Sequence, residues 1–236
     1  MTGHDPNGLA VEYLLATRTG GSGVEMLERR LAGLDELALR RSLDDEAARV
    51  AFWLDIYNAA VVRAGAVDLL DRRVRWLQFG RRSLVVAGER LSLDGIEHGL
   101  LRRSRWKLGL GYVGNPRPSG FERAHRVRRV DPRIHFALNC GATSCPPIAA
   151  YDRERLDEQL ELATTNYLRA ETRRDGDALR VPSLLLWYIG DFGGPPGIRR
   201  LLREAGVAGW SRPLRFAAWD WRPRPDHWME DAARLP

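Results

Sequence analysis

The sequence predicts an α+β fold, in which a helix-rich single domain packs on a small, mainly antiparallel sheet. Two observations support this prediction: apolar residues recur at helical spacing through most of the chain, and strand-like alternation occurs only in short runs. The expected strands are joined by hairpins and long loops, unlike the alternating strands and helices of a doubly wound sheet. We expect a helical lead-in over residues 1–46 and one compact unit over residues 47–236.

Four helices are predicted at the start of the chain. Their expected ranges are Leu9–Ala16, Val24–Leu31, Leu34–Arg41 and a longer core helix, Leu43–Ala66. Ser42 is positioned to cap the long helix, with Asp45 three residues later as in a capping box. Asn58 lies in the largely apolar surface of that helix, and buried polar groups need partners. We therefore expect Asn58 to anchor a neighbouring loop or to orient a catalytic group.

A β-hairpin is predicted over Ser83–Leu93, where two short apolar runs flank a glycine-containing turn. Asp94 follows as an N-cap, with Glu97 as its capping-box partner, and begins a short helix. Asp94, His98 and Arg102 recur at four-residue spacing and therefore share one face of that helix. This polar face is expected to line a cleft.

The rest of the chain alternates between irregular and regular segments. Gly109–Arg129 is rich in Gly, Pro and Arg and is predicted to be an irregular, mobile loop. Arg133–Leu138 alternates between two faces, which predicts a strand, and Asp152 is a candidate cap for the helix after it. The remaining expected elements are helices over Arg153–Arg169, Ser183–Ile189 and Gly197–Ala205 and strands over Ala178–Pro182 and Leu214–Trp221.

Positive charge is concentrated in one segment. The formal net charge is +6, and residues 101–133 alone hold ten basic side chains against two acidic ones. Arg126, Arg128 and Arg129 are therefore candidate anion-binding residues. Nucleic acid is not favoured as the partner, because aromatic residues that stack on bases are sparse in this segment. Only Lys107 among the 37 basic residues is a lysine, a bias that also fits the coding habit of a GC-rich genome.

The sequence shows no secretory signal and no run long enough to cross a bilayer, so we expect a cytoplasmic protein without a membrane partner. In a reducing compartment the two cysteines are expected to be free thiols, metal ligands or a redox pair rather than a permanent crosslink. Both of them, Cys140 and Cys145, lie with His135 in one stretch, Asp131–Pro147. Two thiols this close to an imidazole make the stretch the first candidate for chemistry.

The stretch and the polar helix face together offer the parts of a thiol-dependent enzyme. Cys140 or Cys145 is the candidate nucleophile, and His98 or His135 is the candidate base. Asn139 with the Gly141 amide would stabilise an oxyanion, and Glu97 is an additional catalytic carboxylate. The supporting residues would be Asn58, Arg102, Arg133 and Ser144. An equally weighted alternative is that both cysteines are small hydrophobic residues that pack the turn.

Two further interpretations of the cluster stay open. A zinc site would use the two cysteines with His98 and His135, although four residues between cysteines is at the edge of the usual zinc spacing. No cofactor is required by the sequence. A thiol–disulfide exchange site is the other interpretation, although its spacing is Cys-x-x-x-x-Cys rather than the Cys-x-x-Cys of thioredoxin-like sites.

Five blocks of sequence occur in a recognisable order. They are Ala51–Ala59, Ser92–His98 with Arg102, Asp131–Gly141 through Ser144–Pro147, Trp187–Tyr188 before Asp191–Phe192, and Trp219–Trp221. Together they resemble the successive blocks of the domain of unknown function 547 family. The resemblance implies no established reaction, but some relatives join this domain to glutaredoxin-like, DEP or leucine-zipper segments. Asp55 stands where the family usually has an asparagine.

Two functional hypotheses follow. The first is a thiol-dependent enzyme for acyl transfer, hydrolysis or thiol redox chemistry on a small molecule or peptide, similar in outline to papain-like or transglutaminase-like hydrolases. The second is a non-catalytic binding domain, in which the arginine-rich loop holds an anionic partner and the Cys/His cluster is structural or binds zinc.

Overall fold

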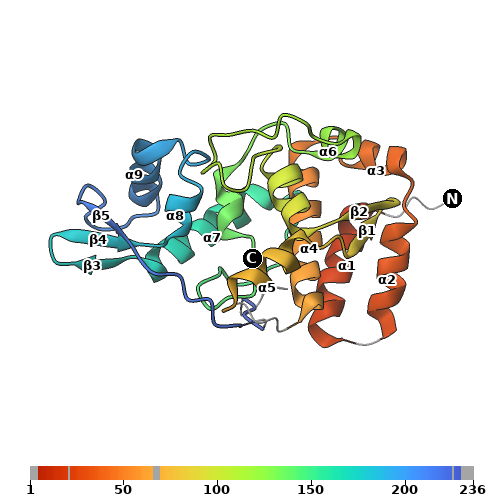
Figure 1. The fold of residues 1–236 in the computed structure, drawn as a ribbon, viewed down its shortest axis with the longest axis horizontal. Helices are drawn as coiled ribbons and strands as arrows, with labels where there is room; N and C mark the ends of the chain where they lie inside the picture. The colour runs from red at the N-terminus through yellow and green to blue at the C-terminus, as the bar shows by residue number, and fades with distance from the viewer. Residues whose placement is uncertain (1–4, 21, 66–69, 225, 230–236) are drawn as a thin grey trace.

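The N-terminal half of the chain is a helical layer built around one buried helix. The computed structural model describes residues 5–20, 22–65, 70–224 and 226–229. Its first four helices are α1 (Pro6–Thr19), α2 (Ser22–Ala32), α3 (Glu36–Ser42) and α4 (Glu46–Ala64). α1 packs along α4, and α2 lies on the outer side of α1 (Figure 1). α4 is buried along most of its length, as its dense apolar pattern predicts.

Aspartates cap three of these four helices, because a short carboxylate can accept the free amides of a first helical turn. The α4 cap corrects our prediction. Ser42 ends α3 instead, and Asp45 is the N-cap of α4 and accepts the Ala48 amide at 2.6 Å. The last residue predicted for this helix, Ala66, lies outside the described residues.

A short helix and a hairpin follow. α5 (Arg72–Gly80) was not predicted, because no residue of it is buried and its sequence lacks an apolar stripe. β1 (Leu84–Val86) and β2 (Glu89–Leu91) pair antiparallel, which confirms the predicted hairpin. The loop predicted as irregular over Gly109–Arg129 is irregular except for one short helix, α6 (Gly120–His125).

The next helix has an unusually wide turn. η1 (Gly95–Leu101) is a π-helix, and its end is closed by an i→i+5 bond from the Arg102 amide to the Glu97 carbonyl at 2.8 Å. The predicted capping box is wrong: the Asp94 side chain caps nothing, and the Ser92 hydroxyl accepts the Gly95 amide instead. Glu97 is therefore free to use its carboxylate elsewhere.

The segment that carries His135 is not a strand. It forms a 3₁₀ turn, η2 (Pro132–Phe136), in which Asp131 accepts the Arg133 amide and Pro132 occupies the first turn. The residues from 134 to 139 are all buried, so the alternation in the sequence did not separate an inner face from an outer one.

The C-terminal half contains the second sheet and the remaining helices. They are α7 (Leu156–Glu171), β3 (Arg173–Asp175), β4 (Ala178–Val181), α8 (Leu184–Trp187), α9 (Gly194–Glu204) and β5 (Leu214–Phe216). β4 is the central strand, antiparallel to β3 and parallel to β5. The N-cap residue of α7 is Arg155, whose side chain makes no cap bond, so the expected cap by Asp152 is wrong. With two small sheets and a majority of helices, the α+β prediction is confirmed.

Each half of the chain packs around its own apolar cluster of buried residues. One joins α1, α4, the hairpin and η1, and the other joins α7, α8, α9 and the second sheet. Phe136 of η2 belongs to the second cluster while its neighbour Ile134 belongs to the first. η2 therefore bridges the two cores, which fixes the position of His135 between them.

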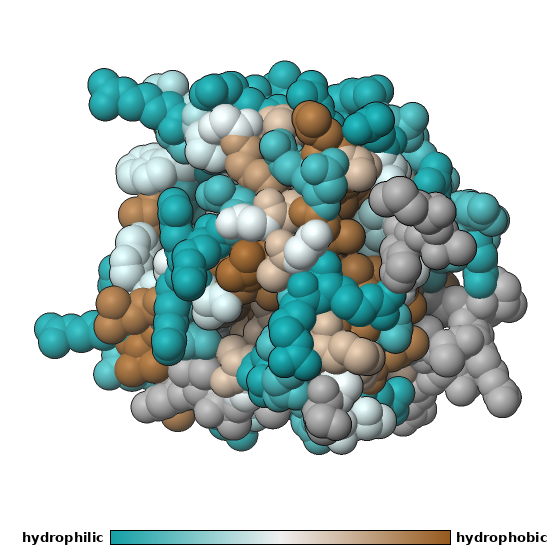
Figure 2. Space-filling model, turned by 90° about the vertical axis from the view of Figure 1, so that its right-hand side faces the viewer, coloured by the Kyte–Doolittle hydropathy of each residue, from teal (hydrophilic) through white to brown (hydrophobic). Residues whose placement is uncertain are grey.

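The surface is mixed in character. The side of the molecule that carries α2 and α3 shows hydrophilic ridges with hydrophobic patches between them (Figure 2). In the described part of the chain, no helix combines the length and the apolar character needed to cross a bilayer.

Candidate functional site

A pocket of about 430 Å³ lies where α5, η1, η2, α8 and the C-terminal segment meet. Its walls are largely aromatic, with the rings of Trp76, Phe79, Trp187, Trp219 and Trp221. Polar groups from η1 and η2 close one side of it. An apolar, ligand-sized cavity with a few polar side chains is the usual form of a small-molecule site.

Both cysteines line this pocket, and their sulfurs are bonded to each other. The bond contradicts the expectation of free thiols or metal ligands, whereas a redox pair and a permanent crosslink are both compatible with it. Cys140 is half-buried, whereas Cys145 is only 3% exposed and packs against Ala142 and Trp219. The backbone amide of Cys140 donates to the Cys145 sulfur at 3.0 Å. The two sulfurs therefore differ in access and in hydrogen bonding.

The turn that carries the disulfide is held by two buried asparagines. The Asn58 side chain accepts the Asn139 amide at 3.0 Å and donates to the Ala137 carbonyl at 3.0 Å, so it anchors the turn to α4. The Asn139 side chain accepts the Gly141 amide at 2.6 Å and donates to the Pro146 carbonyl at 2.6 Å. Because both groups are used inside the turn, Asn139 and the Gly141 amide are not available as the predicted oxyanion stabiliser.

The C-terminal segment braces the same turn from outside. The Ser144 hydroxyl accepts the Asp220 amide at 2.9 Å, and the Thr143 amide donates to the Arg222 carbonyl at 2.9 Å. These bonds hold Trp219 and Trp221 against the pocket. In Figure 1 the irregular segment after β5, in dark blue, runs back beneath α5. Ser144 thus has a structural role that its position in the sequence did not reveal.

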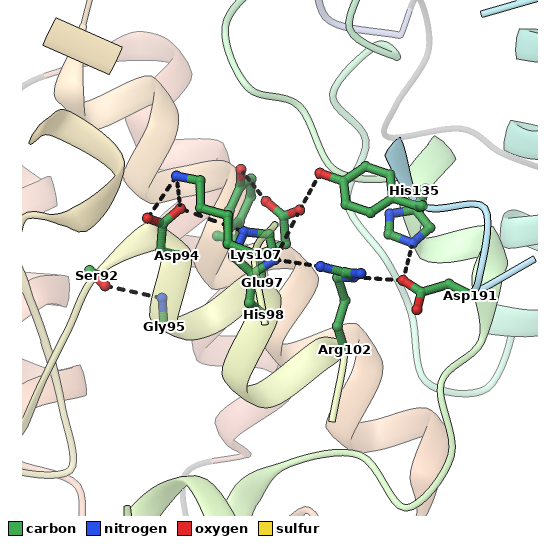
Figure 3. A network of polar contacts seen from close by, with 11 residues as sticks. Ser92, Asp94, Gly95, Glu97, His98, Arg102, Lys107, His135 and Asp191 are labelled. Atoms are coloured by element: carbon green, nitrogen blue, oxygen red, sulfur yellow. Dashed lines mark hydrogen bonds and ion pairs between the residues drawn. The ribbon is translucent and has the colours of Figure 1, made fainter. Parts of the chain in front are cut away.

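Glu97 lies at the centre of a buried polar network on the η1 side of the pocket (Figure 3). Its carboxylate accepts the Tyr188 hydroxyl at 2.6 Å and the Tyr57 hydroxyl at 3.2 Å. Burial alone would raise the pKa of Glu97, but His98, the Tyr188 hydroxyl and Arg102 together lower it. Glu97 is therefore ionised, and it holds two tyrosines rather than capping a helix.

Arg102 links both histidines through one buried guanidinium. It is 0% exposed, donates from Nη1 to His98 Nδ1 at 2.9 Å, and pairs through Nε with Asp191 Oδ2 at 2.6 Å. Asp191 Oδ2 also contacts His135 Nε2 at 2.9 Å. The ring of His135 stacks on Tyr188, with 3.8 Å between centroids. The two histidines predicted as alternative bases thus belong to one network.

The network fixes the protonation of both imidazoles. Burial lowers the pKa of His98 and of His135, so both rings are neutral at pH 7. Arginine only donates, so His98 Nδ1 is an acceptor and its proton is on Nε2, which faces Asp94 at 3.7 Å. The carboxylate of Asp191 only accepts, so the His135 proton is on Nε2. The other ring nitrogen of His135, Nδ1, is then unprotonated and basic.

Asp191 is kept ionised by its two partners in the network. Burial would raise its pKa, but the hydrogen bond from His135 and the charge of Arg102 lower the pKa to about 2. Its other oxygen, Oδ1, and Arg102 Nη2 are buried without partners among the described residues. Beside this network, Lys107 binds both oxygens of Asp94 at 2.8 Å, so Asp94 serves a salt bridge and not the predicted cap.

The basic candidates lie away from the pocket. Arg133 is paired with Asp131 and Asp157, both at 2.7 Å, and does not contact the cysteines. Arg126 donates to the Ser104 hydroxyl, and Arg128 donates to the Asp44 carbonyl. Arg129 lines a separate pocket with mixed charges. The structure therefore does not gather these arginines at the candidate site.

A metal centre is not assembled either. Among the residues that the structure describes, no group of three or more His, Cys, Asp or Glu side chains is arranged to hold a metal ion. Zinc binds cysteine as a thiolate, so the disulfide also removes Cys140 and Cys145 from the predicted set with His98 and His135.

Several site residues were not predicted as such. Asp191, Tyr188 and three tryptophans of the pocket appeared only within the family-like blocks, without a role, and the fourth, Trp76, was not singled out at all. Tyr57 lies on α4 beside Asn58 and looked like a core residue. The number of Trp and Tyr residues in these blocks could have indicated a site, since a buried hydroxyl or indole needs a polar partner.

One family model matches the chain. Described as "Protein of unknown function, DUF547", it matches residues 41–168, more than half of the 236 residues. The chain belongs to this family. The match includes Asn58, η1, η2 and both cysteines of the DUF547 region, whereas Asp191 and the pocket tryptophans after it lie beyond the matched range. No curated protein and no solved structure is significantly similar to the chain.

Proposed function

We propose that this DUF547 protein is a thiol–disulfide oxidoreductase with Cys140 and Cys145 as its redox pair. The observation that carries the proposal is the disulfide in the wall of an aromatic, ligand-sized pocket. A structural role explains it less well, because the crosslink spans a sequence separation of only 5 residues. Closing so short a loop restricts the unfolded chain little and is worth about 2 kcal/mol.

The exchange would begin at Cys140, because it is more exposed than Cys145. A substrate thiolate attacks the Cys140 sulfur, the S–S bond breaks, and Cys145 leaves as a thiolate. The Cys140 amide, which donates to the Cys145 sulfur at 3.0 Å, favours this charge. The second thiol of the substrate then attacks the mixed disulfide. The substrate disulfide forms and the cysteine pair is reduced by two electrons; the reverse sequence reduces a disulfide substrate.

His135 is suited to act as the base for the attacking thiol, which is that of the substrate when the disulfide reacts and that of Cys140 when the reduced pair reacts with a disulfide. Its imidazole is neutral because burial lowers its pKa, and Asp191 orients it through Nε2. Nδ1 is then the nitrogen able to accept a proton from a ligand in the pocket. His98 is less suited, because Arg102 occupies its basic nitrogen.

The lining favours a small molecule or peptide whose thiol or disulfide carries an apolar or aromatic group. Trp76, Trp187 and Trp221 offer flat apolar surfaces. We place the activity in the cytoplasm, as the sequence suggests, where thiol pools would keep the pair cycling.

The proposal is tested by trapping the intermediate. The chain has two cysteines, so each single variant leaves one thiol to follow by mass spectrometry. Folded Cys145→Ser, treated with oxidised glutathione, is expected to form a mixed disulfide at Cys140 at least tenfold faster than Cys140→Ser forms one at Cys145. Equal rates, or reaction only in denaturant, would contradict the proposal.

A histidine pair provides the matched control. His135→Asn should slow trapping at pH 7 while leaving the reaction of a preformed thiolate at pH 9 unchanged. His125 is also buried and paired with a carboxylate, Glu36, but it does not line the pocket. His125→Asn should therefore leave the trapping rate unchanged at both pH values.

A further inference from the structure

A second pocket, of about 410 Å³, lies between the C-terminal end of α7, the start of β3 and the loop after α9. It shares no lining residue with the disulfide pocket. Four arginines line it, and none of its lining residues is acidic: Arg169, Arg173, Arg174 and Arg212.

These four guanidinium groups have no carboxylate partner among the described residues. All four donate to backbone carbonyls instead, and Arg173 Nη1 reaches the Thr172 carbonyl at 3.0 Å. Arg169 Nε donates to the Ala205 carbonyl at 2.7 Å, Arg174 Nε to the Gly176 carbonyl at 3.3 Å, and Arg212 Nη1 to the Asp177 carbonyl at 3.3 Å. A guanidinium has five N–H donors, so each group is positioned while most of its donors stay available to a ligand.

The lining of this pocket differs in charge from that of the other two pockets. The disulfide pocket includes Asp94 and Glu97, and the pocket that includes Arg129 contains four acidic residues, Glu46, Asp131, Glu161 and Glu204, for its three arginines. Elsewhere on the same sheet, Arg180 pairs with Asp175 at 2.9 Å. The four guanidinium groups therefore surround a cavity whose own lining supplies no negative charge.

A buried hydroxyl supports a ligand at this place. Thr172 lines the pocket, is only 9% exposed, and its Oγ1 has no hydrogen-bond partner among the described residues. Buried polar atoms without partners are rare, because each loses the hydrogen bonds that water would make. A ligand oxygen in the pocket would satisfy Thr172 and the arginines together.

Two glycines allow the loop after α9 to lie against the arginines. Gly206 and Gly209 have left-handed φ values of 72° and 76°. A Cβ would lie 2.8 Å from Arg169 Nη2 at the first and 2.9 Å from Arg212 Cδ at the second. The backbone of this loop thus forms one wall of the pocket at close contact.

We propose that this pocket binds a small molecule bearing phosphate groups. Arginine matches the geometry of phosphate oxygens with paired N–H donors, and four positive charges favour a multiply charged anion over a monovalent one. Thr172 would donate its hydroxyl to one of the oxygens. The site is independent of the disulfide pocket and of the redox proposal.

Calorimetric titration of the full chain with inorganic pyrophosphate tests this site, with orthophosphate and chloride compared at constant ionic strength. Pyrophosphate is expected to bind, orthophosphate to bind more weakly, and chloride to give no heat. Arg174→Gln and Arg212→Gln should each weaken binding about tenfold or more, because each removes a charge-assisted contact. Thr172→Val, which keeps the shape of the side chain, should weaken it several-fold.

Arg90→Gln is the matched control, because Arg90 is an exposed arginine of β2 that does not line the pocket. It loses the same charge and should bind pyrophosphate as the parent chain does. Equal weakening by Arg90→Gln would overturn the proposal, since it would indicate binding to net charge alone. The absence of pyrophosphate binding by the folded parent chain would also overturn it, as would tight binding of a single-stranded oligonucleotide without binding of pyrophosphate.

Discussion

Replacement of Arg102 by methionine is expected to destabilise the protein strongly, because one buried guanidinium balances the polar network beside the pocket. Arg102 and the side chain of Asp191 are both 0% exposed, and their ion pair is 2.6 Å long. Removing one partner of a buried pair leaves an uncompensated charge and costs about 3–5 kcal/mol. Methionine keeps the length and the packing of the arginine stem, so most of the cost is electrostatic.

The lowered pKa of Asp191 gives a second indication of how much the network stabilises its ionised form. The folded pKa is about 2, whereas the ordinary pKa of an aspartate is 3.8. This difference corresponds to about 2 to 3 kcal/mol at 1.4 kcal/mol per pKa unit. Because the folded pKa is depressed, the parent chain keeps this contribution above pH 4 and loses it as the pH falls toward 2.

The stability that Arg102→Met removes should also depend on pH near neutrality, through the protonation of His135. The charge of Arg102 is one of the causes that lower the pKa of His135. In the variant, the folded pKa of His135 therefore rises, and a protonated His135 can pair with Asp191 in place of the arginine. A raised folded pKa adds stability below the unfolded pKa of histidine and loses it as the pH rises. The deficit of the variant should be smaller at pH 5.5 than at pH 8.

Urea unfolding at pH 5.5 and pH 8 measures these free energies. The double variant Arg102→Met/Asp191→Asn should be more stable than the sum of the two single changes predicts, because it removes both charges of the pair. The exposed control Arg90→Met should change stability by less than about 0.5 kcal/mol. A deficit below about 1 kcal/mol at both pH values, or additive costs in the double variant, would refute the reasoning.

Two further changes test other parts of the structure. Burial raises the pKa of Asp55 well above 3.8, so the stability that its neutral form contributes at low pH is lost as the pH rises. Asp55→Asn keeps the acceptor for the Tyr151 amide and cannot ionise, so it should raise the melting temperature. A gain in melting temperature that does not grow with pH would contradict this. A Cβ at Gly197 would overlap the Phe192 carbonyl oxygen, so Gly197→Ala should cost about 3 kcal/mol in urea unfolding. Gly120, also helical, has nothing within 4 Å of such a Cβ, and Gly120→Ala should be neutral or stabilising; equal costs for both would show that the contact at Gly197 relaxes freely.

The elements with a clear period were predictable from the sequence. Helices α1 to α4 and α7, the hairpin and β4 lie where the patterns indicate, with boundaries that differ by a few residues. The predicted cap of α4 failed because two capping residues, Ser42 and Asp45, compete within one turn, and only the entry angle of the chain decides between them. α5 gave no signal, since nothing in it is buried.

The site was predictable in part. The Cys140–Cys145 turn, Glu97, His98 and Arg102 do line one region, as the local patterns suggested. The role of His135 was not visible, because its partner Asp191 is 56 residues away and reaches it only through the packing of α8 on η2. The role of Asn139 inside the turn was also not visible in the sequence. An asparagine side chain can hydrogen-bond either to the backbone or to a ligand, and the sequence does not distinguish the two.

The most direct test of the redox proposal is the equilibrium between Cys140–Cys145 and a glutathione or dithiothreitol buffer, measured on the folded chain by counting alkylated cysteines. We predict complete, reversible conversion to a dithiol without unfolding, at a potential within the range of known oxidoreductases, about −270 to −120 mV. A potential below about −300 mV, or reduction only after the fold is lost, would contradict the account and identify the disulfide as structural.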